Sequence, residues 1–372
     1  MSPTLRVCLA DMNQGHPNQA IRCFRLIIDE FFARVRLRNP KLETSLIHVQ
    51  PRNLHELPPD NCDIYLSTGG PGTPYEHDGE HWLTQMRHWY DRIVDRTIQH
   101  GPSAPALFGV CYTFELLIRH FAVSGMERRA STKFGVMPIY MTPKGMEHPL
   151  THVFGDRLFS FEHRNWEAID LDERRLRELG GSVLARESRD GESKGRALLA
   201  LEFAPGVEGT QFHPEADRGG VVAWLSKREQ AEAFVAAYGH ETYDRMIHTL
   251  DNPNRLARTF ALMIPGWLTR KFNLLAYERG WKSLEQPQLD MATFAGDAPP
   301  AHSVRFDSLI PPPVTPVPRS EQDDEAFVFP EIPNLGVPTF EEVAALESSP
   351  RVPAAVRVTS SERRLPVNPQ AE

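Results

Sequence analysis

The chain has 372 residues, of which 41% are apolar and 24% charged, a balance typical of a globular protein that buries one large core or two smaller ones. Its formal net charge is -8 and it contains no long run of Lys or Arg, so the composition argues against a nucleic-acid partner. No run approaches the roughly 20 apolar residues that a bilayer span requires, which argues against a membrane protein.

The first part of the chain alternates short apolar runs with longer segments of helical period. Residues 5–11 predict a strand and residues 20–35 a helix, in which Phe24, Ile28 and Phe31 share one face. The elements expected next are strands at 44–50 and 62–68, a helix at 81–100 and a fully apolar strand at 105–110. This alternation predicts an α/β fold with a mainly parallel sheet and covering helices.

The pattern changes after residue 133. Shorter extended pieces at 134–142, 158–166, 181–188 and 196–203 predict antiparallel additions to the same domain, which a helix at 229–247 closes near residue 245. Residues 246–286 predict a helical C-terminal extension that is interrupted at Pro265. Residues 287–372 hold 15 of the 32 prolines without apolar periodicity, which predicts a disordered tail.

The cysteines and the N-terminus favour a reducing compartment. The four cysteines are far apart and form no CxxC pair, which is untypical of a disulfide framework or a zinc site. The first residues, MSPTLRVCLAD, lack the charged start and apolar stretch of an export signal. We therefore expect a cytoplasmic protein. His77 and His81 could suggest a metal site, but Gly79 interrupts the helix that would align them, so we expect none.

A cysteine lies at the junction of a strand and a helix in the segment LFGVCYTFELL. The strand at 105–110 ends directly before Cys111, and a helix begins at about Tyr112. Such a turn exposes the side chain, and the peptide dipoles at a helix N-terminus favour a thiolate. The position therefore predicts a nucleophile, although a buried structural cysteine is the commoner occupant of a strand end.

Two further segments carry residues that would serve a cysteine nucleophile. In EGTQFHPEAD, His213 and Glu215 are two apart on a predicted extended segment, so the carboxylate lies on the same face as the imidazole and can orient it. In STGGPGTPYE, Gly70 and Gly72 follow a predicted strand and let backbone N–H groups face a concavity, as an oxyanion hole requires. All three segments follow strands, where open α/β sheets place their ligand sites.

In this order, GGPGTP, GVCY and TQFHPE resemble the three signatures of class I glutamine amidotransferase domains, especially the glutaminase part of GMP synthase. The resemblance covers residues 1–245. It implies a flavodoxin-like, mainly parallel sheet with helices on both faces. It also implies a Cys-His-Glu triad made of Cys111, His213 and Glu215. The stretch from HPL to FEHRNW is similar to a further family stretch, which makes His163 another candidate site residue.

The resemblance further implies a mechanism for glutamine or a γ-glutamyl amide. Cys111 attacks the side-chain amide carbon, ammonia leaves with a proton from His213, and water hydrolyses the thioester. No cofactor is implied. The backbone N–H groups expected to hold the oxyanion belong to Gly70, Gly72 and Tyr112. The side chains expected to contact the substrate belong to Glu115, Gln211 and Phe212.

Two positions depart from the family pattern and leave three hypotheses open. The family elbow is usually GxCxGxQ, whereas Thr113 replaces its second Gly and Glu115 its Gln. The chain is therefore a glutamine amidohydrolase, a γ-glutamyl peptidase or amidase with the same triad, or a non-catalytic binding protein that retains the fold. For the first, we expect an ammonia-accepting synthase subunit on another chain, because neither GxxxxGK[ST] nor GxGxxG occurs here.

Overall fold

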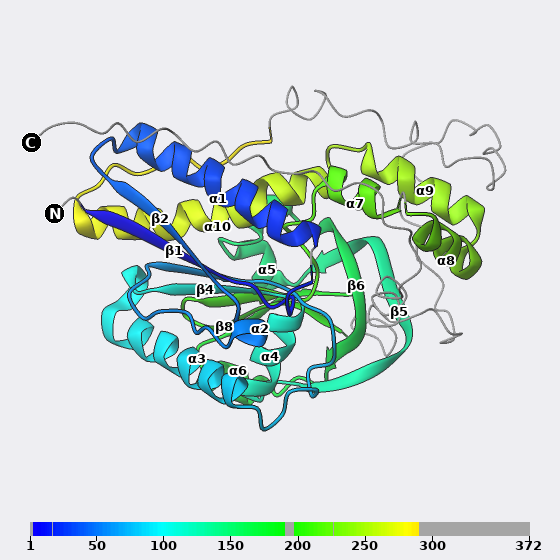
Figure 1. The fold of residues 1–372 in the computed structure, drawn as a ribbon, viewed down its shortest axis with the longest axis horizontal. Coiled ribbons are helices and arrows are strands. Elements are labelled where there is room, and N and C mark those ends of the chain that lie inside the picture. Colours follow the sequence, from blue (N-terminus) through cyan, green and yellow to red (C-terminus); the bar gives the residue numbers. More distant parts are fainter. Residues whose placement is uncertain (1–2, 17, 190–196, 226, 290–372) are drawn as a thin grey trace, which may run out of the picture. The chain divides into compact units, whose positions relative to one another are not determined.

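The computed structural model describes residues 3–16, 18–189, 197–225 and 227–289, which form one nine-stranded sheet with helices on its faces (Figure 1). The strands are β1 (Thr4–Ala10), β2 (Glu43–Val49), β3 (Ile64–Ser67), β4 (Ala106–Val110), β5 (Gly125–Met141), β6 (Arg157–Ile169), β7 (Ser182–Arg186), β8 (Leu198–Ala204) and β9 (Val207–Thr210). The helices are α1 (Gln19–Arg38), α2 (Pro51–Leu54), α3 (His81–His100), α4 (Tyr112–Phe121), α5 (Pro143–Glu147), α6 (Glu173–Glu178), α7 (Arg218–Leu225), α8 (Arg228–Tyr238), α9 (His240–Leu250) and α10 (Leu256–Arg279), with short 3-10 turns at Gly101–Ser103 and His152–Phe154.

The sheet has a parallel half and an antiparallel half. Strand β1 pairs in parallel with β2 and β3, and the parallel pairing continues from β3 to β4 and from β4 to β9. Beyond β9 the order continues as β8-β6-β5-β7 with antiparallel pairs, and β7 also pairs with β8, which closes these four strands into a ring. The α/β prediction and the antiparallel additions are confirmed, but the sheet as a whole is mixed.

The parallel half is covered on both faces. Helices α1 and α10 lie side by side over one face, and α3 and α4 cover the other (Figure 1). Strands β3 and β4 are buried along their whole length, as expected for parallel strands between two helical layers. Helix α1 turns a buried stripe toward the sheet through Phe24, Ile27, Phe31 and Val35, at the spacing of an amphipathic helix.

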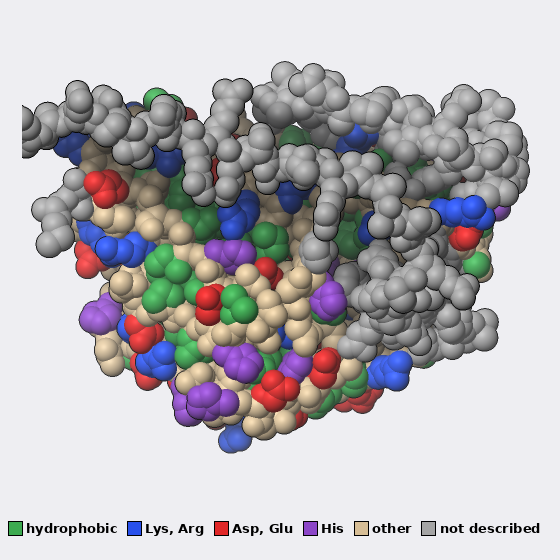
Figure 2. Space-filling view, in the orientation of Figure 1, with side chains coloured by type: hydrophobic (Ala, Val, Ile, Leu, Met, Phe, Trp, Pro, Cys, Tyr) green, Lys and Arg blue, Asp and Glu red, His purple; other side chains and the backbone are tan. Residues whose placement is uncertain are grey.

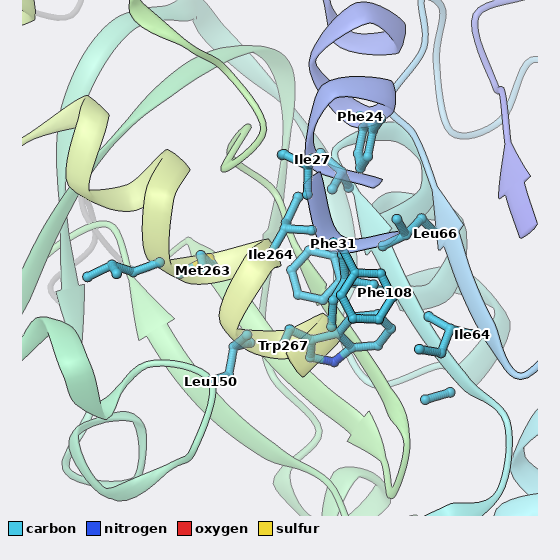
Figure 3. Packing of buried hydrophobic residues seen from close by; sticks show 14 of the residues in the cluster. Phe24, Ile27, Phe31, Ile64, Leu66, Phe108, Leu150, Met263, Ile264 and Trp267 are labelled. Atoms are coloured by element: carbon cyan, nitrogen blue, oxygen red, sulfur yellow. The ribbon is translucent and has the colours of Figure 1, made fainter. Parts of the chain in front are cut away.

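Helix α10 belongs to the core of the parallel half. Figure 3 shows Phe31 of α1, Phe108 of β4 and Trp267 of α10 in the same cluster. The rings of Phe108 and Trp267 pack edge to face with centroids 5.3 Å apart. The predicted interruption at Pro265 is wrong, since α10 continues through this residue. Burial of the turns on both sides of the proline offsets the cost of its missing N–H.

The structure also changes the helix and the domain boundary predicted for the C-terminal part of the chain. The helix expected at 229–247 is divided into α8 and α9 at Gly239, whose φ of 81° ends the first helix. The expected boundary at residue 245 falls inside α9. The predicted disordered tail lies, from residue 290 onward, outside the described residues.

Two observations concern the surface. No described helix is both long enough and apolar enough to cross a bilayer. On the face drawn in Figure 2, the Lys and Arg side chains of the described residues are interspersed with Asp and Glu.

Candidate active site

Cys111 occupies a strained turn between β4 and α4. Its backbone has φ 48° and ψ -105°, a combination that a residue with a side chain rarely adopts and that is held here by neighbours on both sides. The Cys111 N–H donates to the Thr210 carbonyl of β9 at 2.7 Å, and the Cys111 carbonyl accepts from the Glu115 N–H at 3.0 Å. The thiol therefore stands directly before the first turn of α4, where the helix dipole favours negative charge.

His213 and Glu215 lie together as the sequence predicts, although they do not lie on a strand. Strand β9 ends at Thr210, His213 makes a single antiparallel bridge to Phe161, and Glu215 lies in the following turn. The Glu215 carboxylate nevertheless meets Nδ1 of His213, with 2.9 Å between Oε1 and Nδ1. Glu215 is buried and His213 is 17% exposed.

The charge state of His213 follows from its neighbours. Burial by itself lowers the pKa of this imidazole, but the Glu215 carboxylate and the hydrogen-bonded Cys111 sulfur together hold the pKa well above its usual value. Because Nδ1 is hydrogen-bonded to Glu215, Nε2 is the ring nitrogen left to hydrogen-bond the Cys111 sulfur. An imidazolium next to a cysteine stabilises the thiolate, which is the nucleophilic form.

The glycine-rich loop after β3 lies against this pair. A Cβ built on Gly69 would stand 3.1 Å from Cβ of Cys111 and 3.1 Å from Cε1 of His213, so only glycine leaves room for both side chains here. The three sequence motifs thus meet at the C-terminal ends of β3, β4 and β9, the edge at which open α/β sheets bind their ligands.

The predicted oxyanion donors belong to the first turn of α4 and to the glycine loop after β3. Tyr112 begins α4, so its N–H belongs to the helix N-terminus. Gly70 and Gly72 follow Gly69 in the loop, and within the described chain neither of their N–H groups donates a hydrogen bond to the protein. In the loop, Gly69 is the glycine that lies against Cys111, whereas Gly70 lies against the Met12 carbonyl and Gly72 against the Glu76 carboxylate.

The predicted substrate contacts divide into two groups. Gln211 Nε2 lies 3.8 Å from Sγ of Cys111 and donates to Oε1 of Glu115 at 3.0 Å. Both side chains are buried, and Oε1 of Gln211 has no hydrogen-bond partner among the described residues. Phe212 lies in the hydrophobic cluster below α1 and α10, because successive residues of an extended segment point to opposite sides. The structure therefore does not bring Phe212 to the site.

Thr113 has a structural role at the elbow. Its hydroxyl donates to the Thr68 carbonyl at 2.8 Å and lies 2.8 Å from the Ser67 hydroxyl, which ties α4 to the end of β3. The extra side chain is accommodated by Gly109, where a Cβ would stand 2.7 Å from Cγ2 of Thr113. The departure from the family glycine is thus compensated within the strand.

Comparison with known proteins gives weak similarity only. No family profile and no curated protein matches the sequence. Among solved structures, a glutamine amidotransferase from Thermotoga maritima aligns at 16% identity and a TM-score of 0.44, over 73% of this chain and 97% of its own. A glutamine amidotransferase from Methylobacillus flagellatus aligns at 14% and 0.45, over 77% and 98%. A putative GMP synthase component from Thermoplasma acidophilum aligns at 15% and 0.37, over 57% and 85%.

Identities under 25% indicate at most a shared fold, and a fold hosts many activities.

Two histidines singled out in the sequence have other surroundings. His163 packs its ring against Phe134 and Trp224, and burial, together with the charge of His213, lowers its pKa to about 4. It is therefore neutral near pH 7. Nδ1 of His77 lies 2.7 Å from Oε1 of Glu80, and its Nε2 lies 2.8 Å from Nη2 of Arg52.

One group of the described residues has the spacing of metal ligands, namely His148, Glu202 and Glu208. The Glu208 carboxylate, however, already accepts hydrogen bonds from Trp267 and Arg270 and lies 3.5 Å from Nζ of Lys271. Two cations beside the carboxylate disfavour a third, so the group is an internal ion cluster.

The sequence gives little indication of Arg52, which enters the site from α2. Its side chain is 5% exposed, and its guanidinium lies over the Tyr112 ring, 4.3 Å from the centroid. The only signal is positional, since α2 directly follows β2 and therefore lies at the C-terminal edge of the sheet.

Proposed function

We propose that this chain hydrolyses the side-chain amide of glutamine through a thioester on Cys111. The observation that carries the proposal is the hydrogen-bonded series Glu215, His213 and Cys111, arranged beside a glycine loop and a helix N-terminus. A nucleophile, a base, a residue that orients the base and donors for an oxyanion are the parts that acyl transfer from an amide requires.

Acylation uses the thiolate and the imidazolium together. The sulfur of Cys111 attacks the amide carbon, a C–S bond forms, and the carbonyl π pair moves onto oxygen beside the N–H groups of Gly70, Gly72 and Tyr112. The tetrahedral intermediate collapses as the C–N bond breaks. The leaving nitrogen takes the proton from Nε2 of His213 and departs as ammonia, which leaves a γ-glutamyl thioester and a neutral imidazole.

In deacylation His213 acts as a base, whereas in acylation it acts as an acid. Nε2 of His213 removes a proton from a water as the water oxygen attacks the thioester carbon, and the C–S bond then breaks. Glutamate leaves, while the thiolate and the imidazolium are restored. Glu215 stays ionised throughout and holds the imidazole in place, as the carboxylate of a catalytic triad does.

The finer features of the fold are part of the proposal. The parallel strand order β2-β1-β3-β4-β9, with helices on both faces, supports a flavodoxin-like arrangement for this half of the sheet. Residues 1–245 carry the amidotransferase-like site, since Cys111, His213 and Glu215 lie within them, and α10 completes the core of the same unit. Ammonia would pass to an acceptor on another chain, because the sequence carries neither GxxxxGK[ST] nor GxGxxG for an ATP-dependent acceptor site.

The decisive experiment is steady-state release of glutamate from glutamine, with Cys111→Ser as the inactive variant. A serine hydroxyl remains protonated beside His213, so we expect release to fall below detection. Cys23→Ser is the matched control, since Cys23 is a buried thiol whose pKa burial raises to about 12, 3.5 Å from an Asp217 oxygen. This control should keep the wild-type rate. If wild type releases no glutamate, whether by itself or with candidate acceptor proteins, the proposal is wrong.

One observation favours a second substrate class, the γ-glutamyl peptides and amides. Glu115 places a carboxyl beside the nucleophile where the family pattern has an amide, and the neighbouring Gln211 Oε1 has no partner. Release of amine from γ-glutamyl amides, with glutamine hydrolysis absent, would support this alternative.

A further inference from the structure

Arg52 joins three separate segments of the candidate site. Its Nη1 donates to the Met12 carbonyl at the end of β1, at 2.9 Å, and to the Pro71 carbonyl in the glycine loop, at 2.7 Å. Its Nη2 donates to Oε1 of Gln14 at 3.1 Å and meets Nε2 of His77 at 2.8 Å. The guanidinium also covers the Tyr112 ring, so it contacts both sides of the predicted oxyanion hole.

The contact with Pro71 fixes the direction of a predicted oxyanion donor. The carbonyl of Pro71 and the N–H of Gly72 belong to one peptide unit, which is planar and trans, so the two groups point in opposite directions. Holding the carbonyl on Nη1 therefore turns the Gly72 N–H away from Arg52. In the described chain this N–H donates no hydrogen bond to the protein and stays available to a ligand.

The other loop donor is fixed in the same way by a different side chain. The Thr68 hydroxyl donates to the Gly69 carbonyl at 2.8 Å, and this carbonyl shares its peptide unit with the Gly70 N–H. A Cβ on Gly70 would stand 2.1 Å from the Met12 carbonyl, which also accepts a hydrogen bond from Arg52. The loop is thus packed against the end of β1, and Arg52 joins the two.

The charge of Arg52 is not neutralised by a carboxylate. Among the described residues no Asp or Glu forms an ion pair with it, and its guanidinium meets only carbonyls, an amide oxygen, an imidazole and a ring. The Glu80 carboxylate accepts a hydrogen bond from Nδ1 of His77, so Nε2 of this ring is the acceptor for Arg52. The loop nevertheless also carries the Glu76 carboxylate, which lies 3.5 Å from Nε2 of His77, so Arg52 acts through its hydrogen bonds and not through an unopposed charge.

We propose that Arg52 is a positioning residue that sets the oxyanion hole, because it holds the Pro71 carbonyl and thereby orients the Gly72 N–H toward the substrate. The inference rests on the proposed amide hydrolysis at Cys111. Arg52 touches neither the nucleophile nor the base, so it acts through the loop. Its loss weakens stabilisation of the tetrahedral intermediate and leaves the Cys111–His213 pair intact.

The test compares two reactions of the same cysteine in the full-length protein. Glutamine hydrolysis passes through an oxyanion, whereas alkylation by iodoacetamide is a displacement at an sp³ carbon and needs none. We expect Arg52→Met to lower kcat on the order of 10²-fold, the cost of one oxyanion donor, with little change in KM. The alkylation rate should stay within about threefold of wild type, because the thiolate is unchanged.

Two further variants separate positioning from stability and charge. Arg52→Lys keeps the charge but cannot span both carbonyls with one planar fork, so kcat should recover only in part. Arg34→Met removes an arginine that likewise donates to a distant carbonyl, that of Glu285, and it should leave kcat unchanged.

Equal losses of hydrolysis and alkylation in Arg52→Met, or an unchanged kcat, would overturn the inference. An inactive wild type would instead count against the proposed hydrolysis.

Discussion

Glu115 is a buried carboxyl of the candidate site whose ionisation changes near neutral pH. Burial raises the pKa of Glu115 to about 7, against the opposing effects of the Gln211 hydrogen bond and the charges of Arg164 and His213. Below this pKa the group is neutral and, like an amide, has both a donor and an acceptor. Above it the group is an anion that accepts from Gln211, whose Nε2 lies 3.8 Å from Sγ of Cys111. Glu115 can therefore replace the hydrogen bonds of the family Gln only below a pH of about 7.

Replacing this carboxyl tests that account. In wild type we expect kcat/KM for glutamine to fall as pH rises through about 7, because the Glu115 anion opposes charge developing at Cys111. Glu115→Gln removes the titration, so the decline near pH 7 should disappear and the rate at pH 8 should rise severalfold. The measurement is kcat/KM from pH 5.5 to 9. Glu173→Gln, which changes a carboxylate that is 70% exposed on α6, is the control and should keep the wild-type profile.

At the scale of secondary structure, β9 and α10 are joined by a buried ion cluster. Glu208 of β9 is fully buried and accepts from Trp267 and Arg270 of α10. Burial opposes ionisation, but Lys271 and Arg270 outweigh it and lower the pKa of this carboxyl to about 2. The cluster therefore fixes the helix against the strand that leads to His213.

Removing this charge should destabilise the protein in a pH-dependent way. Glu208→Gln leaves two cations without their counter-ion, so we expect the free energy of unfolding at pH 7 to fall by about 3 kcal/mol. Because the folded pKa is depressed, the stabilisation is present above the unfolded pKa and is lost as pH falls from about 4.5 toward 2.

Chemical denaturation of both proteins from pH 7 to pH 2.5 checks this expectation. Glu178→Gln, which breaks an exposed pair with Arg174, should change the free energy by less than about 1 kcal/mol. A constant difference between wild type and Glu208→Gln at all pH values would contradict the account.

At the scale of the whole molecule, the helix after residue 255 and the N-terminal helix share one core. The rings of Phe31 in α1 and Phe272 in α10 pack edge to face with centroids 6.0 Å apart, and both side chains are buried. A helix that contributes so much apolar surface should unfold together with the sheet that it covers.

Truncating this contact should lower the stability of the entire α/β unit. Phe272→Ala removes a buried ring, so we expect a loss of about 4 kcal/mol and a single unfolding transition at lower denaturant. Tyr277→Ala on the same helix is the control, since Tyr277 is 93% exposed and its loss should cost little. Fluorescence and circular dichroism should report the same midpoint. Two separate transitions would indicate that α10 is an independent appendage.

The sequence by itself determined the features that depend on neighbouring residues. The stripe of Phe24 and Phe31 predicted α1, the apolar run at 105–110 predicted β4, and the turn after it predicted the position of Cys111. Helical spacing, strand burial and helix termini are local properties, so a pattern of a few residues is enough to reveal them. The order of the three motifs then indicated one shared site, because strand ends meet at one edge of a parallel sheet.

The tertiary structure alone decided what depends on residues far apart in the chain. It continues α10 through Pro265, because packing on the sheet outweighs the local effect of a proline. It assigns Gln211 to the site and Phe212 to the core. It also brings Arg52 to the Pro71 carbonyl, 19 positions along the chain. Contacts of this kind are set by how the elements pack together, and no local pattern in the sequence encodes them.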